Sequence, residues 1–283
     1  MKVDFFSLAG IRSVILVLFI AVLTIVGGVE ASPTTNVHIV KFSTDGNTML
    51  AERSVDYQWL ESHLPVMGDG RTHYYHQGPV FADNKSDQWD PMETKNFKDQ
   101  GAVKGTDIRD LCELVGGMKP GDTVMVHAVD GYHLEFEYPN VYTPEPRQGP
   151  IVLCWYNGED SEVGERQGVG YPPDYYTGMR LVFFADNSTN TRQEHVFGNF
   201  DMHEVMPNES IHLYENLYPS TNGYTAKWVD EVRIYDGGYH GPTDDPIQSL
   251  ATGNPPATTA SAPLIVTLLA CGTLIALSRR GFR

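Results

Sequence analysis

The chain has 283 residues and a formal net charge of −16, with 36 acidic against 20 basic side chains. A surface this acidic repels phosphate backbones, so the composition argues against DNA or RNA as a partner. Once the two apolar ends are set aside, about 210 residues remain for folding, which suits one domain or two small ones.

The first 31 residues have the order of features that is typical of an export signal. Lys2 and Arg12 give a positive start, residues 14–28 are apolar apart from Thr24, and Val29-Glu30-Ala31 offers small residues for a cleavage site. An uncleaved N-terminal anchor is the alternative, but the apolar run is short for a membrane span. We therefore expect a signal peptide over residues 1–31.

Residues 32–65 predict a small β-grasp-like unit. Residues 37–42 alternate as a strand, residues 44–48 have the composition of a turn, and residues 49–55 return as a second strand. A short helix is expected over residues 56–61. We expect this unit to precede a larger domain over residues 66–240.

A segment with little periodicity follows over residues 63–103. It is rich in His, Tyr, Asp, Gly and Pro. Irregular segments of this length inside a compact domain are usually functional or disordered. Its aromatic residues, among them Tyr74, Tyr75 and Trp89, indicate that much of it is packed.

Clear patterns return from residue 105. Thr106 is predicted to cap a helix whose apolar face includes Ile108 and Cys112, and Gly116-Gly117 should end that helix. Asp130-Gly131 is a hairpin signal between two alternating strands.

Three further strands are predicted over residues 151–155, 179–185 and 226–235. One helix among many strands predicts an α+β fold that is mixed and mostly β.

The C-terminal end predicts attachment to a membrane. Residues 241–261 are rich in Pro, Thr, Gly and Ser, which suits an extended stalk. Residues 262–278, from Leu264 to Leu277, are apolar, and Arg279 and Arg280 open a basic tail over residues 279–283. Such a segment is either a short span with its charges in the cytoplasm or a sorting tail. We expect the cell membrane as the location, with the folded part outside.

If the chain is exported, three N-glycosylation sequons become usable, and the compartment would allow a disulfide to form. The sequons begin at Asn84, Asn187 and Asn208. Cys112 and Cys154 could form a disulfide, but both lie inside apolar patterns and are expected to be small buried side chains.

Two sets of side chains are candidates for a site. Imidazoles and a carboxylate suit Zn, Ni or Cu, and the candidate ligands are His73, His76, His195, Asp201 and His203. No known spacing links them, so hydrogen-bonded or surface histidines are the alternative. Aromatic loops with a few polar groups suit a small ligand, and the candidates there are Arg147, Gln148, Asp174, Tyr175 and Tyr176. Loop packing is the alternative for this second set.

Several short motifs follow one another between residues 105 and 232. They are Gly105-Thr106-Asp107-Ile108-Arg109-Asp110-Leu111, Ala128-Val129-Asp130-Gly131-Tyr132, Ile151-Val152-Leu153 with Asn157-Gly158, Tyr176-Thr177-Gly178-Met179-Arg180-Leu181-Val182, and Lys227-Trp228-Val229-Asp230-Glu231-Val232. This order resembles the oxidoreductase molybdopterin-binding domain, the sulfite-oxidase-like family, over residues 100–240. The resemblance implies that family's fold and a cofactor pocket.

One departure separates this chain from the resembled family. The family's molybdenum ligand is a Cys before the Gly-led helix, and no Cys precedes Cys112 here. The resemblance therefore implies a pocket in which molybdopterin would lack its usual thiolate.

We expect a non-catalytic surface protein that binds a small molecule or an envelope protein. The alternatives are an extracytoplasmic pterin-dependent oxidoreductase and a purely structural envelope protein.

Overall fold

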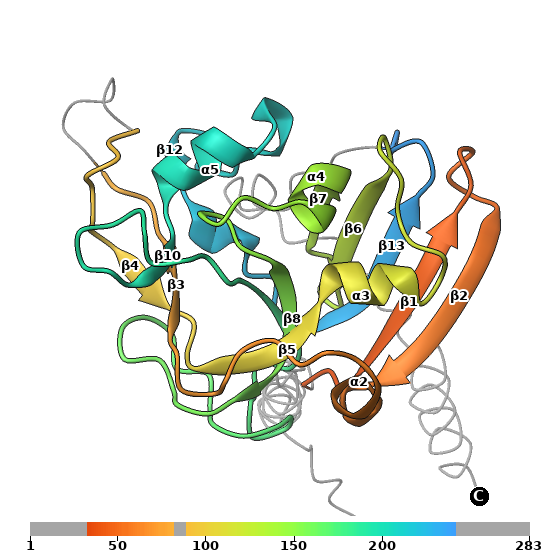
Figure 1. The fold of residues 1–283 in the computed structure, drawn as a ribbon, viewed down its shortest axis with the longest axis horizontal. Helices are drawn as coiled ribbons and strands as arrows, with labels where there is room; N and C mark the ends of the chain where they lie inside the picture. Colours follow the sequence, from red (N-terminus) through yellow and green to blue (C-terminus); the bar gives the residue numbers. More distant parts are fainter. Residues whose placement is uncertain (1–32, 82–88, 242–283) are drawn as a thin grey trace, which may run out of the picture.

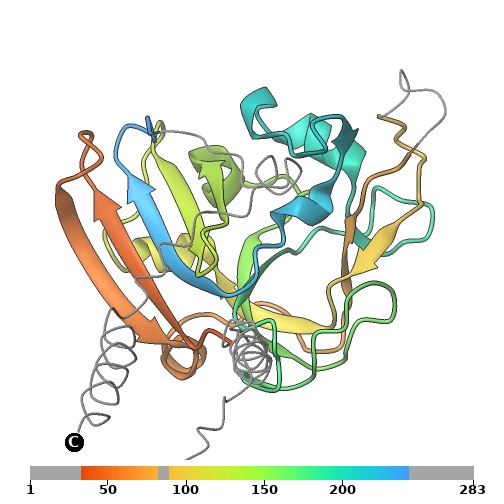
Figure 2. The same cartoon turned by 180° about the vertical axis from the view of Figure 1, so that it is seen from behind.

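A computed structural model describes residues 33–81 and 89–241 of the chain. It is a mixed α/β structure built mostly of sheets with few helices, as predicted. The largest sheet has five strands in the order β2-β1-β13-β6-β7 (Figures 1 and 2). Its strands are β1 (Asn36–Phe42), β2 (Met49–Asp56), β6 (Thr123–Ala128), β7 (His133–Glu137) and β13 (Val229–Tyr235).

Smaller sheets complete the β structure. A three-stranded sheet has the order β5-β8-β9, a second has the order β10-β3-β4, and β11 pairs with β12. Their strands are β3 (Tyr74–Gln77), β4 (Phe97–Asp99), β5 (Val103–Asp107), β8 (Ile151–Asn157), β9 (Arg180–Phe183), β10 (His195–Phe197), β11 (Leu213–Tyr214) and β12 (Tyr218–Pro219).

The helices are short and sit at strand ends. They are α2 (Tyr57–His63), α3 (Ile108–Glu113), α4 (Tyr138–Tyr142), α5 (Asn199–Val205) and the 3-10 turns η1 (Asn208–Ser210) and η2 (Thr221–Tyr224). Helix α3 packs against β13 and β8 (Figure 1). Its buried residues, Ile108, Leu111 and Cys112, form the apolar face that the sequence predicted.

The main core lies between the inner faces of the five-stranded sheet and the β5-β8-β9 sheet. Ile39, Val126 and Ile234 enter it from the first sheet, and Leu153 and Phe183 enter it from the second. The opposite face of the β5-β8-β9 sheet carries a smaller apolar cluster around Val152, Cys154 and Val182. Because successive side chains of β8 and β9 point to opposite faces, this one sheet contributes to two apolar layers.

The predicted N-terminal unit is part of the main sheet. Strand β1 pairs with β2 on one side and runs parallel to β13 on the other, with Val40 opposite Arg233. Residues 33–65 therefore do not form a sheet of their own. Val37 and Ile39 of β1 are fully buried and belong to the same core as Val232 and Ile234 of β13.

The predicted cap of α3 is corrected by the structure. Thr106 lies in β5, where its Oγ1 accepts a hydrogen bond of 3.1 Å from Nε1 of Trp155. Asp107 caps the helix instead, since its carboxylate accepts from the backbone N–H of Arg109 at 2.9 Å. The helix ends at Glu113 with Leu114 as its C-cap, a few residues before the predicted Gly116-Gly117 stop. Gly117 has a φ of 70°, and its N–H donates to the carbonyl of Cys112.

The prediction of a transmembrane helix is also corrected. Across residues 33–81 and 89–241, no helix has both the length and the apolar character needed to cross a membrane. The predicted signal peptide, stalk and anchor, and the anchor residues Leu264, Leu277, Arg279 and Arg280, lie outside the described residues.

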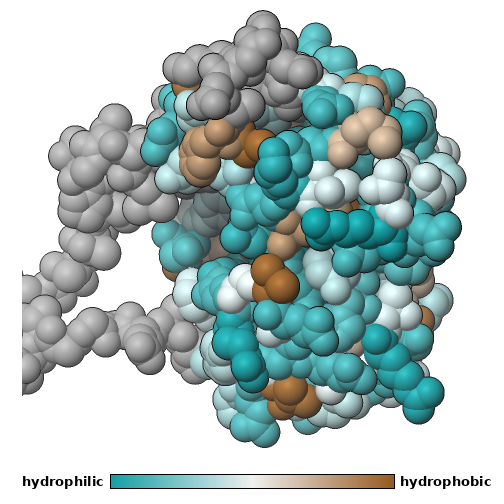
Figure 3. Space-filling model, turned by 90° about the vertical axis from the view of Figure 1, so that its left-hand side faces the viewer, coloured by the Kyte–Doolittle hydropathy of each residue, from teal (hydrophilic) through white to brown (hydrophobic). Residues whose placement is uncertain are grey.

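Most of the visible surface in Figure 3 is hydrophilic, with hydrophobic residues scattered over it. Two of the three sequon residues, Asn187 and Asn208, are exposed, while Asn84 lies outside the described residues. Their exposure leaves both asparagines accessible to modification.

Candidate functional site

A cavity of about 730 Å³ opens in the described part of the molecule. Several elements distant in sequence form its wall: β4, the turn between β6 and β7, the loop before β9, β9 itself and the segment before β13. The charged lining residues are Lys98, Asp99, Asp130, Glu165, Arg180 and Lys227. We call this hollow the Arg180 cavity.

Arg180 is the most unusual residue of this wall. It begins β9 and is only 2% exposed. Its Nη2 donates a hydrogen bond of 2.6 Å to Oε1 of Gln100, but its Nε and Nη1 have no hydrogen-bond partner. An arginine is always charged, and a buried charge is costly unless it is paired.

The side chain of Gln100 is fixed from the other side. Its Nε2 donates to the carbonyl of Lys98 at 2.9 Å and to Oδ1 of Asn222 at 3.2 Å. The amide therefore presents its oxygen to Arg180. This neutral contact positions the guanidinium but supplies no negative charge.

The nearby carboxylate of Asp99 is already committed elsewhere. It lies 2.9 Å from Nδ1 of His73 and accepts from the backbone N–H groups of Gly101 and Glu162, each at 2.8 Å. Arg180 forms no ion pair with any described residue. Its positive charge thus has no acidic partner among the described residues.

Two other cations line the cavity and differ in their pairing. Lys227 forms an ion pair with Glu165. Lys98 forms no ion pair within residues 33–81 and 89–241. The cavity therefore carries two cationic side chains without an acidic partner, Arg180 and Lys98.

Aromatic side chains complete the wall. Tyr132 follows the hairpin turn, and its hydroxyl donates to the carbonyl of Gly223. Trp228 has a positive φ of 52°, and its Nε1 donates to the carbonyl of Tyr176 at 3.3 Å. Flat apolar surfaces beside a buried cation suit an organic ligand that bears a negative group.

The structure separates the predicted ligand-binding residues, and none of them lines the Arg180 cavity. Gln148 is fully buried and exchanges hydrogen bonds with Asn140, so it holds a loop together. Tyr175 is fully buried, whereas Asp174 and Tyr176 are exposed.

Arg147 lines a second, smaller cavity of about 230 Å³ together with Asp201. Its Nη1 lies 3.7 Å from Oδ1 of Asp201. Burial raises the pKa of Asp201 to about 6, although its hydrogen bonds with Gly198 and Thr189 act in the opposite direction. Asp201 thus caps the start of α5 rather than serving as a metal ligand.

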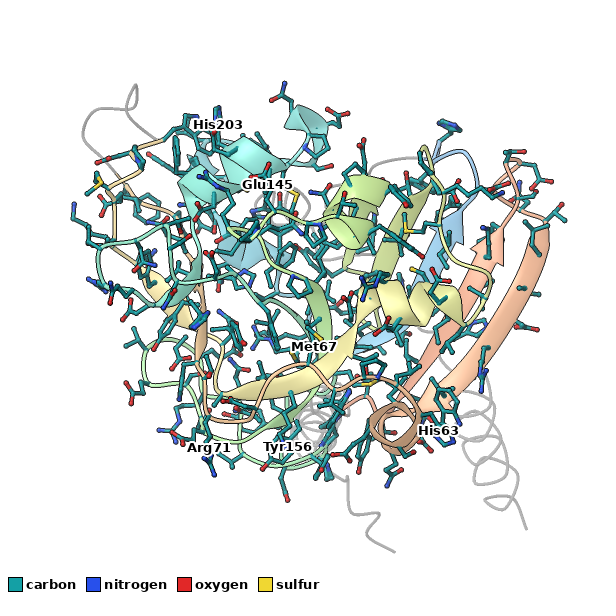
Figure 4. All side chains as sticks on the ribbon, viewed as in Figure 1. His63, Met67, Arg71, Glu145, Tyr156 and His203 are labelled. Atoms are coloured by element: carbon teal, nitrogen blue, oxygen red, sulfur yellow. The ribbon has the colours of Figure 1, made fainter. Side chains whose placement is uncertain are left out.

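The predicted metal ligands are not brought together. The described residues hold no group of three or more His, Cys, Asp or Glu side chains that could bind a metal ion. His203 lies on the exposed side of α5 (Figure 4), and Nδ1 of His195 lies 2.8 Å from the carbonyl of Ala185.

His76 is a buried structural histidine. Its Nδ1 lies 2.9 Å from the carbonyl of Thr221, and its Nε2 accepts from the backbone N–H of Phe183 at 3.1 Å. Burial lowers the pKa of His76 to about 3, so the ring is neutral. Both ring nitrogens are occupied, which leaves none for a metal.

The two described cysteines are free and buried, as predicted. Burial raises the pKa of both thiols. Cys154 stands opposite Arg180 in the β8–β9 pairing, but it is fully buried and does not line the cavity. The Arg180 cavity therefore has no thiolate in its wall.

Reasoning from the sequence did not identify Arg180 as a site residue. The signal was present, because one arginine interrupts the apolar run of residues 179–185. Charged residues are almost never fully buried unless they are paired, so such an interruption marks a candidate site.

The chain matches no protein-family model, and no curated protein matches it significantly.

Proposed function

We propose that this protein is a non-catalytic cell-surface module that binds a small anionic ligand in the Arg180 cavity. The observation that carries the proposal is the buried guanidinium of Arg180, two of whose nitrogens lack a hydrogen-bond partner. A bound anion would accept those hydrogen bonds and offset the buried charge. Charge-assisted hydrogen bonds of this kind are about twice as strong as neutral ones.

The motifs that resemble the molybdopterin-binding family support the same site. Asp130 and Tyr132 come from the Asp-Gly-Tyr turn, Arg180 from the Gly-x-Arg strand, and Lys227 and Trp228 from the closing Lys-Trp strand. All five residues line the Arg180 cavity. We therefore infer a fold of the sulfite-oxidase type, with the cavity in the place of the cofactor pocket.

The wall of the cavity fits the phosphate of a pterin cofactor but not its metal. Such a cofactor carries a phosphate, which Arg180 and Lys98 would hold, and it supplies electron transfer at its metal. The thiolate that the resembled family gives to molybdenum has no equivalent among the lining residues. This difference favours binding without oxidoreductase turnover.

A small molecule is also favoured over an envelope protein as the ligand. Arg180 is nearly inaccessible from outside, with 2% exposure. A protein surface would reach only the rim of the cavity, where Lys227 and Glu165 lie. A small anion that enters the cavity would lie closer to this buried charge than a protein surface could.

Calorimetric titration of the purified protein with inorganic phosphate tests the proposal. Arg180→Gln should weaken binding roughly ten- to a hundredfold, because hydrogen bonds to a charged group contribute about 1.5–3 kcal/mol. The control is Arg166→Gln, which removes the same charge from an exposed side chain paired with Asp160. Equal affinities for the two variants would refute the site.

A second variant keeps the test decisive if the buried substitution Arg180→Gln misfolds. Lys98→Glu changes the charge at the wall without touching a buried ion pair, and it should also weaken phosphate binding. Thermal melting of both variants without phosphate will show whether each is folded.

Metal analysis distinguishes the proposal from the oxidoreductase alternative. Protein made in a host that assembles molybdopterin should contain no stoichiometric molybdenum. About one molybdenum per chain that is lost on Cys154→Ala would instead establish the oxidoreductase.

A further inference from the structure

Two segments far apart in sequence meet at the rim of the Arg180 cavity. Glu165 lies in the loop between β8 and β9, Lys227 lies just before β13, and their side chains form an ion pair. Both residues line the cavity. The ion pair therefore ties together two parts of the wall at the place where a ligand would bind.

The ion pair between Glu165 and Lys227 is weak because water reaches both side chains. The side chain of Glu165 is 58% exposed and that of Lys227 is 27% exposed. Ion pairs with such access to water contribute only about 0.2–1 kcal/mol, and salt screens them. An anion inside the cavity competes for Lys227 at small cost.

The loop around Glu165 is held on both sides. The Nε of Arg166 donates to Oδ2 of Asp160 at 2.7 Å, and the backbone N–H of Gln167 donates to Oδ1 of the same carboxylate at 2.8 Å. Gln167 itself is 1% exposed. Release of Lys227 thus needs only a rotation of the Glu165 side chain, not a movement of the loop.

Lys227 is suited to change partners. A lysine ammonium is a compact charge on a flexible stem with three donors, so it can turn from one acceptor to another. Arg180 is fixed by Gln100 and by its strand, and it cannot follow a ligand in this way. One fixed cation and one adjustable cation together match a doubly charged anion.

We infer that the Glu165 carboxylate is a built-in competitor for Lys227, and that the ligand of the Arg180 cavity is a doubly charged oxyanion group, such as a phosphate, that displaces Glu165. This inference rests on the proposed function. Glu165 thereby sets selectivity: Arg180 and Lys98 attract a singly charged anion and a dianion alike, whereas a dianion also draws Lys227 away from Glu165.

The test is a titration of the purified full-length protein with inorganic phosphate at a pH where the dianion predominates. Glu165→Gln should tighten binding about two- to fivefold, which corresponds to the strength of an exposed ion pair. The matched control is Glu162→Gln, an exposed residue of the same loop that does not line the cavity. It changes the net charge equally and should alter affinity little.

A double-mutant cycle assigns the effect to Lys227. In a Lys227→Gln background, Glu165→Gln should no longer tighten binding, since there is no ammonium to release. An equal gain for Glu165→Gln and Glu162→Gln, or a gain that persists in the Lys227→Gln background, would overturn the inference.

The outcome also separates this inference from the proposed function. Phosphate binding that Arg180→Gln abolishes but Glu165→Gln leaves unchanged would refute the role of Glu165 and keep the site. No phosphate binding to the wild-type protein or to any variant would refute both.

Discussion

Arg180 and His76 are two buried basic side chains whose surroundings differ. Each nitrogen of His76 that can form a hydrogen bond has a protein partner, whereas two of the three guanidinium nitrogens of Arg180 have none. His76 escapes the cost of burial by remaining neutral, and arginine cannot. This difference separates a structural residue from a candidate ligand-binding residue.

The titration of His76 predicts acid sensitivity. Burial disfavours the charged ring, so its pKa is about 3 in the folded protein, against an ordinary histidine value of 6.5 in the unfolded chain. The unfolded chain therefore binds the extra proton between these values, and stability falls as pH decreases below 6.5. His76→Gln removes this contribution, so the stability difference between wild type and variant should shrink by about 2 kcal/mol from pH 7 to pH 5.

Urea unfolding at both pH values measures this change. The control is His203→Gln, which makes the same substitution at an exposed histidine. A stability difference for His76→Gln that does not vary with pH would show that His76 does not stay neutral on folding.

The sequence pointed to His76 as a candidate but not to Arg180, and it could not show the partners of either residue. His76 was a candidate by residue type alone, while its neutrality follows from burial, and its ring contacts the carbonyl of Thr221, which lies 145 residues further along the chain. To identify Arg180, one would need to know that its side chain meets the neutral amide of Gln100, which Asn222 holds in place, and not a carboxylate. These contacts follow from tertiary packing and leave no local pattern.

At the scale of elements, the β6–β7 hairpin was predicted closely. Gly131 has a φ of 90°, and its N–H donates to the carbonyl of Ala128. A Cβ at Gly131 would have no atom within 4 Å. The need for glycine here is therefore conformational, not steric.

Gly131→Val should lower the free energy of unfolding by roughly 1–2 kcal/mol, because a branched side chain disfavours positive φ. Gly131→Asn should cost less, since asparagine tolerates such angles. Thermal or urea unfolding of both variants measures the difference. Equal losses would point to a role of Gly131 other than its backbone angle.

The elements that were missed are short and paired at long range. Strands β3, β4 and β10 have only three or four residues each and form one sheet from three separate parts of the chain. No alternation can be recognised over so few residues. The misplaced cap at Thr106 has the same origin, since β5 exists only because β8 pairs with it across a bulge at Lys104 and Gly105.

At the scale of the whole molecule, the expected boundary near residue 65 separates strands that share one sheet and one core. Strands β1 and β2 form the side of the main sheet next to β13. Their buried residues Val37, Ile39 and Val55 belong to the same core as Ile234. Removal of residues 33–65 would therefore expose the core rather than release a separate unit.

A chain of residues 33–241 should unfold in one cooperative transition and remain monomeric. A chain of residues 66–241 should show no cooperative melt, because β13 would lose its neighbour β1. Circular dichroism melting curves and gel filtration compare the two. An equally sharp melt of the shorter chain would establish two independent units.

The parallel pairing of β1 with β13 also orders events during synthesis. Strand β1 is the first regular strand of the described residues to be made and β13 is the last, and they are neighbours in the finished sheet. A nascent chain therefore cannot close its main sheet until residue 235 has been added. The order of synthesis thus leaves β1 without its parallel neighbour until the last described strand is complete.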